Sequence, residues 1–352
     1  MDLEAYDFEL PADAIAQRPC DRRDQARMFF LSRAGEGQQH SQITALPEFL
    51  RPEDLLVVNT TRVLPARLRG QKSSGGHAEA LLLESVEASN VSSEEPSKRK
   101  TYRALVRCGG RMHEGQRFVF RADEKELGAE LIAREAEGVV VLAFDNGKSP
   151  YELGEMPLPP YIRRDQAKPE DGERYQTVFA QQDGSVAAPT AGLHFTRELL
   201  AALEARGVEV AEVVLHVGPG TFRPLGPDQL ATGKLHAERF ELPEATAAAI
   251  ARTRERGGRV IAVGTTTTRV LESQAVEDGL VRAGEGSTEI FIYPGVPFRV
   301  IDGLITNFHL PKSSLLLLVA AFVGRERILS AYAEALDQGY RFYSYGDAML
   351  IL

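Results

Sequence analysis

Leu55-Leu56-Val57-Val58 is a run of four apolar residues, two of them β-branched, and Asn59-Thr60-Thr61-Arg62 follows it directly. A short apolar run that ends in polar residues is typical of a strand buried inside a sheet. We expect residues 59–62 to form a polar loop at the carboxyl end of this strand. Ligands of α/β proteins collect at such ends, so this loop is the first candidate for a functional site.

On the carboxyl-terminal side, strand and helix signals alternate. Residues 208–217 and 260–263 indicate strands, whereas residues 196–206, 243–256 and 267–274 indicate helices. Thr196 is a suitable cap for the first helix, and Pro243 stands near the start of the second. Such alternation predicts a largely parallel sheet covered by helices.

Between residues 63 and 155 the pattern changes to short strands separated by turns such as Gly109-Gly110. This pattern predicts a small antiparallel barrel, and the Ser-, Glu- and Lys-rich residues 85–100 predict a flexible loop within it. The expected fold class is therefore α/β, with a layered, mostly parallel or mixed sheet and helices, interrupted by an inserted antiparallel β-barrel. The expected domains are 1–62 with 156–352, and 63–155.

The composition is that of a soluble globular protein, with 43% hydrophobic and 26% charged residues among 352. The longest apolar stretch, residues 315–323, is too short to span a membrane and predicts a buried helix. The acidic N-terminus lacks the features of a signal peptide. Two isolated cysteines, Cys20 and Cys108, form no disulfide framework, which favours a cytoplasmic location.

The net charge of -9 argues against a nucleic-acid-binding protein. The charge is uneven, however, because residues 60–121 contain twelve Lys or Arg and six Asp or Glu. A basic face on the predicted barrel can therefore bind a polyanion. An ordinary solvated surface also explains this local excess of Lys and Arg.

Four histidines, His194, His216, His236 and His309, lie in polar segments that contain Gly or Pro. Histidine exchanges a proton near neutral pH and suits general acid–base catalysis, but each of these also suits a structural, hydrogen-bonded role. Their spacing matches no zinc site. A loop at residues 264–268 can bind an anion through its backbone N–H groups or simply cap a helix, and it lacks the lysine of a P-loop.

Long, specific strings occur along nearly the whole chain. They are Tyr6-Asp7-Phe8, Ala16-Gln17-Arg18-Pro19, Asn59-Thr60-Thr61-Arg62-Val63, Leu158-Pro159-Pro160-Tyr161-Ile162, Glu173-Arg174-Tyr175-Gln176-Thr177-Val178, and residues 188–195, 217–224, 306–314 and 340–349. Together they resemble the S-adenosylmethionine:tRNA ribosyltransferase-isomerase family of queuosine biosynthesis.

The resemblance implies a reaction on tRNA that carries 7-aminomethyl-7-deazaguanine at the wobble position. S-adenosylmethionine donates its ribosyl group and is consumed, epoxyqueuosine-tRNA forms, and adenine and methionine leave. A sulfonium is already a good leaving group, so this chemistry needs a base and exclusion of water, without a metal or other cofactor. We expect a monomer with no membrane association.

Residue chemistry and the resemblance together give the expected site. For proton transfer we expect His194 and His309 first and His216 next, with Asp347 or Glu238 orienting a histidine or holding ribose hydroxyls. The expected substrate contacts are Asn59, Arg62, Thr190, Glu238, Thr266, Asn307 and Lys312. The expected tRNA contacts are Arg103, Arg107 and Arg111. Because His194 and His309 fall in polar segments, we expect their replacement by Ala to cost little stability.

Two other classes of function compete with this interpretation. The four histidines are compatible in principle with a metal-dependent hydrolase, which metal analysis of the purified protein separates. A non-catalytic RNA-binding protein can use the predicted barrel alone, but the extended α/β region and its loop histidines then have no role.

Overall fold

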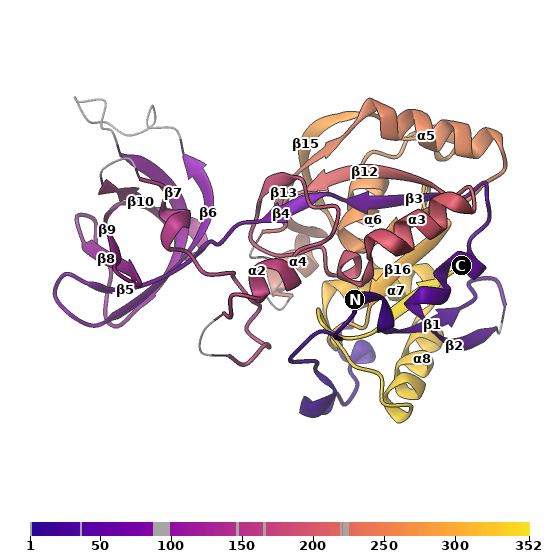
Figure 1. Cartoon of the computed structure of the whole chain (residues 1–352), viewed down its shortest axis with the longest axis horizontal. Helices are drawn as coiled ribbons and strands as arrows, with labels where there is room; N and C mark the ends of the chain where they lie inside the picture. The colour runs from indigo at the N-terminus through magenta and orange to yellow at the C-terminus, as the bar shows by residue number, and fades with distance from the viewer. Residues whose placement is uncertain are drawn as a thin grey trace.

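A large α/β body and a small β-barrel make up the computed structural model, in which the barrel lies to one side of the body (Figure 1). The structure describes residues 2–35, 37–86, 99–145, 148–164, 167–218, 220 and 225–352. Most of the predicted flexible loop at residues 85–100 lies outside the described residues.

The α/β body contains a mixed sheet of nine strands within the described residues. In spatial order they are β15 (Gly284–Ile290), β13 (Lys234–Leu242), β12 (Glu209–Leu215), β3 (Leu55–Asn59), β14 (Val260–Val263), β16 (Gly303–Asn307), β17 (Ala348–Ile351), β1 (Arg27–Leu31) and β2 (Gln38–Gln42). The four central strands β12, β3, β14 and β16 run parallel, so their carboxyl ends share one edge. The outer pairs β12–β13, β13–β15, β16–β17 and β1–β2 are antiparallel.

Helices cover both faces of this sheet. Leu55 and Val57 of β3 belong to a hydrophobic cluster with α5 to α8, whereas Leu56 and Val58 pack on the other side with α1 and α3. This alternation follows from the two-residue period of a strand and explains why the whole apolar run is buried. The helices are α1 (Leu46–Phe49), α2 (Asp171–Arg174), α3 (Arg197–Ala205), α4 (Pro227–Thr232), α5 (Glu244–Glu255), α6 (Thr265–Ser273), α7 (Ser314–Val323) and α8 (Arg325–Asp337).

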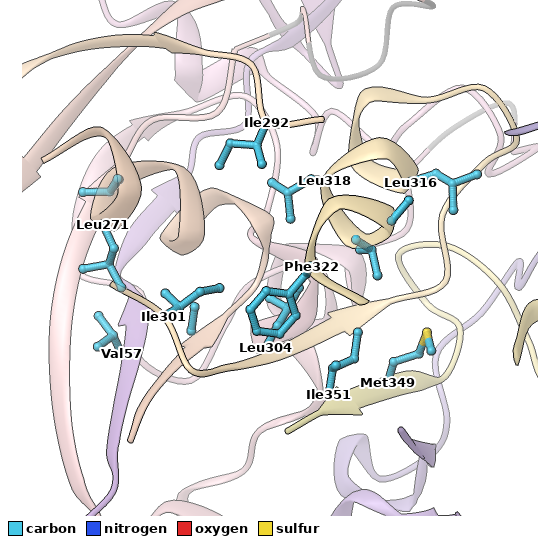
Figure 2. Close-up of a cluster of buried hydrophobic side chains, with 14 of the residues drawn as sticks. Val57, Leu271, Ile292, Ile301, Leu304, Leu316, Leu318, Phe322, Met349 and Ile351 are labelled. Carbon is cyan, nitrogen blue, oxygen red and sulfur yellow. The ribbon is translucent and has the colours of Figure 1, made fainter. Parts of the chain in front are cut away.

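Figure 2 shows the first of these clusters, in which the sheet residues Val57, Leu304 and Ile351 face Leu271 of α6 and Phe322 of α7. The apolar residues 315–323 thus form a buried helix, α7, and Ser313 caps it by accepting a hydrogen bond from Leu316 N at 3.2 Å. Thr196 caps α3 in the same way through Leu199 N at 3.1 Å, as predicted. In the described parts of the chain, no helix combines the length and apolarity needed to span a membrane.

The inserted barrel is closed and antiparallel, with strand order β10-β7-β6-β5-β8-β9. Its strands are β5 (Arg67–Lys72), β6 (His77–Val86), β7 (Lys100–Cys108), β8 (Arg117–Ala122), β9 (Lys125–Arg134) and β10 (Val139–Phe144). Gly70 of β5 is required at the close β5–β8 contact, because a Cβ there would lie 2.2 Å from Val119 O. Where the chain enters and leaves the barrel, Arg67 and Glu155 exchange two backbone hydrogen bonds of 3.1 and 2.8 Å.

The predicted fold class, a mixed sheet with helices and an inserted barrel, is confirmed. The division into domains at residues 62/63 and 155/156 stays a prediction. The predicted polar loop at residues 59–62 is wrong: Asn59 ends β3, and after Thr60 the chain forms β4 (Thr61–Val63), which pairs in parallel with β11 (Gln182–Ser185). Val63 is buried, so this short strand is held by packing as well as by pairing.

Candidate active site

A cavity of about 630 Å³ opens where β14 and β16 end and α6 and α7 begin. This position is the carboxyl edge of the parallel strands, where α/β proteins bind ligands. Five of the predicted site residues line it: Thr190, Thr266, Asn307, His309 and Lys312. Its other lining residues include Tyr161, Pro189, Gly264, Thr265, Thr306, Tyr343 and Ser344.

Gly264 turns the chain from β14 into α6 at the cavity wall. Its φ of 92° is a left-handed conformation that glycine adopts without strain. The hydroxyl groups of Thr267 and Thr268 donate back to Val263 O and Gly264 O at 2.7 and 3.1 Å. Thr265 and Thr266 are the threonines of this first turn that line the cavity.

Asn307 is the centre of a buried hydrogen-bond network. Its Oδ1 accepts from the Thr190 hydroxyl at 3.1 Å, while its Nδ2 donates to His194 Nε2 at 3.1 Å and to Tyr343 O at 3.0 Å. Because Nε2 of His194 accepts, the proton of the neutral ring lies on Nδ1. His194 does not line the cavity; its contact with the lining is the hydrogen bond that it accepts from Asn307.

His309 lines the cavity directly. Its Nε2 is 2.7 Å from the Thr306 hydroxyl, and its backbone N–H donates to the Tyr332 hydroxyl at 3.0 Å. Burial lowers the pKa of His309 to about 3 and that of His194 to about 4. Both rings are therefore neutral at pH 7, and the same burial makes each of them a weaker base than an exposed histidine.

The two buried histidines give the protein a specific pH dependence of stability. The folded-state pKa values of His309 and His194, about 3 and about 4, lie below the unfolded value of 6.5. The part of the free energy of unfolding that comes from this difference is therefore complete above pH 6.5 and is lost as the pH falls. At pH 5 we expect the free energy of unfolding in urea to be lower than at pH 7 by about 2 kcal/mol per histidine. Replacement of either by Asn should remove its share of this difference.

The matched control for this measurement is His113→Asn, because His113 is an exposed residue of the barrel. It should leave the difference between pH 7 and pH 5 unchanged. Equal pH dependence in His309→Asn, His194→Asn and the unmodified protein would show that neither ring is held neutral by burial.

Burial also overturns one expectation from the sequence. His194 ends the 3₁₀ helix η9 (Thr190–His194) and is 3% exposed, and His309 is 7% exposed, so neither lies in a solvated polar loop. Their replacement by Ala leaves space and unpaired polar groups in the interior, so we now expect a substantial loss of stability in place of the small one.

Three predicted residues lie behind the cavity wall. Asn59 binds both backbone groups of Leu215 at 3.1 Å and donates to the Thr266 hydroxyl at 3.3 Å. His216 Nδ1 is 2.8 Å from the Thr61 hydroxyl, and burial together with Arg239 lowers its pKa. Glu238 accepts from Gly218 N at 2.9 Å. Asn59 thus contacts a lining residue, Glu238 contacts the neighbour of one, and His216 is joined to β4.

Three further predicted residues have partners of their own. Lys312 lines the cavity, but its ammonium group lies 2.8 Å from both Glu4 and Asp7. Arg62 is exposed and binds Ala180 O at 2.9 Å. Asp347 accepts hydrogen bonds from the backbone of Arg27 and Arg341 and does not line the cavity.

The sequence analysis missed an aromatic pair. The rings of Tyr161 and Tyr343 lie with centroids 4.0 Å apart on the cavity wall. Tyr343 has a φ of 73°, and its buried hydroxyl has no hydrogen-bond partner within the described residues. Both tyrosines occur in the strings that resemble the family. That resemblance is the sequence signal that could have pointed to them.

Among the described residues, no three His, Cys, Asp or Glu side chains come together in a way that could hold a metal ion. The metal-dependent hydrolase therefore has no ligand set in that part of the chain. A cavity at the carboxyl edge of a parallel sheet, lined by the neutral His309 and by an aromatic pair, is typical of an α/β enzyme, and this α/β body carries an inserted barrel.

Comparisons with known proteins identify the family. Residues 3–351 match the family described as queuosine biosynthesis protein. The chain is 50% identical to the S-adenosylmethionine:tRNA ribosyltransferase-isomerase of Gloeobacter violaceus, over 99% of this chain and 95% of that protein, and 48% identical to that of Moorella thermoacetica over all of both. The crystal structure of the S-adenosylmethionine tRNA ribosyltransferase from Thermotoga maritima is similar, with 36% identity, a TM-score of 0.55, and 99% and 100% of the two chains covered.

The chain belongs to the queuosine biosynthesis protein family and is an enzyme of the transferase class.

Proposed function

We propose that this enzyme transfers and isomerises the ribosyl group of S-adenosylmethionine onto 7-aminomethyl-7-deazaguanine at the tRNA wobble position. The products are epoxyqueuosine-tRNA, adenine and methionine. The names of full-length relatives at 50% and 48% identity support the two substrates. We further propose that a cytoplasmic monomer acts without a metal or other cofactor.

The observation that carries this proposal is the cavity of about 630 Å³ at the carboxyl edge of the sheet, lined by neutral His309 and by Tyr161 and Tyr343. Aromatic rings suit contact with a planar purine base. In the proposed course, a base removes a C5′ proton beside the sulfonium, ring opening expels adenine, and the aminomethyl nitrogen attacks the sugar. Epoxide closure then expels methionine.

His309 is the proposed base, because it is the histidine of the Asn307 and Thr306 networks that reaches the cavity. Asn307 and Thr190 are proposed substrate contacts, and His194 positions Asn307 by accepting its N–H. Thr266 is a further proposed contact, held by Asn59.

Product analysis tests the function directly. Purified protein should release adenine and methionine from S-adenosylmethionine only when tRNA bearing the aminomethyl base is present, and activity should survive exhaustive chelation. The control is the same tRNA with unmodified guanine. Methyl transfer to tRNA, or no release with correctly prepared tRNA, contradicts the proposal.

Arg103, Arg107 and Arg111 of the barrel stay the proposed tRNA contacts, but we expect Arg103 to contribute less to binding than the other two. Arg103 already pairs with Glu84 and Glu135 at 2.8 Å each, whereas Arg107 and Arg111 are exposed and have no recorded ion pair within the described residues. Phosphate contacts release counterions, so replacing Arg107 and Arg111 by Gln should weaken tRNA binding and flatten its log–log salt dependence by about one unit per contact. Arg103→Gln should have a smaller effect.

Titration of tRNA at several salt concentrations measures both quantities, and binding of S-adenosylmethionine alone is the control. If the triple Arg103, Arg107 and Arg111 to Gln variant keeps the unmodified affinity and salt slope, tRNA docks elsewhere. The α/β body offers a separate hollow of about 410 Å³ that Arg18 and Arg163 line.

A further inference from the structure

The first turn of α6 begins at the cavity and has open hydrogen-bond donors. Gly264 stands at the N-cap, where it has no side chain to accept a hydrogen bond from the turn, and its φ of 92° disfavours the residues that usually cap a helix. The backbone N–H groups of Thr265 and Thr266 have no acceptor within the described residues. Gly264, Thr265 and Thr266 all line the cavity, so these donors border the space that a ligand can fill.

Thr265 adds a hydroxyl group that the described part of the chain leaves unpaired. The residue is 7% exposed and lines the cavity, yet its hydroxyl has no hydrogen-bond partner there. The next two threonines, Thr267 and Thr268, do not line the cavity, and their hydroxyls donate to backbone carbonyls at 2.7 and 3.1 Å. A polar group this buried normally has a partner, so the unpaired hydroxyl of Thr265 indicates a ligand.

Thr266 supplies a second hydroxyl donor at the same place. It is 8% exposed and lines the cavity, and its Oγ1 accepts a hydrogen bond from Asn59 Nδ2 at 3.3 Å. Because this bond uses a lone pair, the hydroxyl proton stays available for a ligand. Asn59 is itself fixed by both backbone groups of Leu215, at 3.1 Å each, so the position of the Thr266 hydroxyl is set before a ligand binds.

The charges at the cavity define which ligand group suits these donors. Lys312 is the one charged side chain among the described lining residues, and Glu4 and Asp7 already hold its ammonium group at 2.8 Å each. The N-terminus of a helix carries a partial positive charge and binds single anionic groups such as a carboxylate. In an α-amino acid the ammonium group balances the carboxylate, so neutral donors suffice. A tRNA phosphate brings an unbalanced negative charge into a buried place.

We propose that the first turn of α6 binds the carboxylate of the methionine moiety of S-adenosylmethionine. The hydroxyl and backbone N–H groups of Thr265 and Thr266 are the donors. The inference rests on the proposed function and adds a specificity-determining site to it, since this turn distinguishes the intact amino acid from a compound that lacks the carboxylate.

Steady-state kinetics at saturating substrate tRNA test this assignment. Thr265→Val removes the hydroxyl at nearly constant volume. We expect it to raise the KM for S-adenosylmethionine about tenfold with kcat changed less than about threefold, because the carboxylate is bound equally before and during the reaction. The inhibition constant of decarboxylated S-adenosylmethionine, measured as a competitor, should change less than about threefold. Thr265→Ser retains the hydroxyl and should restore the KM.

Thr267→Val is the matched control on the same turn. Its hydroxyl donates to Val263 O at 2.7 Å and does not line the cavity, so this variant should lose stability in urea and keep its KM. Thr265→Val should show the opposite pattern, with an unchanged free energy of unfolding, because its hydroxyl has no partner in the described structure. If Thr265→Val does not fold, Thr265→Ala removes the same hydroxyl and should raise the KM for S-adenosylmethionine equally.

The outcomes separate the inference from the function. An unchanged KM for S-adenosylmethionine in Thr265→Val, or equal losses for S-adenosylmethionine and its decarboxylated analogue, overturns the assignment and leaves the proposed function standing. A raised KM for tRNA with an unchanged KM for S-adenosylmethionine assigns the turn to a phosphate and also overturns it. Absence of adenine release by the unmodified protein with substrate tRNA overturns the proposed function, and the inference with it.

Discussion

Replacing His309 by Ala is expected to lower kcat for adenine release by about 10²–10⁴-fold, the usual effect of losing a general base. His309 lines the cavity, is neutral at pH 7 because burial lowers its pKa to about 3, and has its Nε2 fixed 2.7 Å from the Thr306 hydroxyl. Single-turnover measurement with saturating tRNA and S-adenosylmethionine isolates the chemical steps from binding.

Two companion variants make this result interpretable. His309→Gln retains polar atoms in the buried position and should keep more stability than His309→Ala, yet lose a comparable amount of activity. His113→Ala changes an exposed histidine of the barrel and should have no effect. A folded His309→Gln protein with a near-normal single-turnover rate would show that another group removes the proton, and His194 is then the next to test.

The lowered pKa also sets an expectation for the pH profile of the reaction. A histidine with an ordinary pKa near 6.5 produces an acid limb close to that value, whereas His309, with a pKa of about 3, produces none above pH 5. An acid limb near pH 6.5 that disappears in His309→Gln would mean that substrate binding raises the pKa of this ring by several units.

Local sequence patterns predicted most of the architecture, because the signals for a strand or for a helix cap come from residues that are close together in the chain. The apolar run at residues 55–58 gave a buried strand, and the Thr196 cap gave the start of α3. The strand β9 has a weak local signal, because Lys125–Arg134 contains four charged residues and several good helix formers, and pairing with β8 and β10 decides its conformation. β4 was missed because its partner, β11, lies more than a hundred residues away in the chain.

The site was predicted less completely, because side-chain networks depend on distant contacts. The histidines were chosen for their chemistry, but only the structure shows that Asn307 occupies His194 Nε2 and that His309 faces the cavity. Tyr161 and Tyr343 lie 182 positions apart in the sequence, and no local pattern signals that their rings pack together.

Asp347 is the predicted catalytic residue whose assignment changes most. Its side chain is 1% exposed, and Oδ1 accepts from Arg27 N at 3.0 Å while Oδ2 accepts from Arg341 N at 2.8 Å. The Arg341 guanidinium group donates to Oδ1 as well, at 3.0 Å. Asp347 thus joins the start of β1 to the segment before β17, and it stays outside the cavity lining.

Replacement of Asp347 by Ala is therefore expected to destabilise the protein by about 3–5 kcal/mol, because it leaves two backbone donors and one guanidinium group without their acceptor. Asp347→Asn retains one acceptor oxygen and should lose less. Urea unfolding measures the loss, and kcat per folded molecule of Asp347→Asn measures the chemistry. A hundredfold fall in kcat at an unchanged free energy of unfolding would restore Asp347 to a catalytic role. A large loss of stability with kcat within a few-fold of the unmodified enzyme identifies it as the anchor that holds Tyr343 and Ser344 at the cavity.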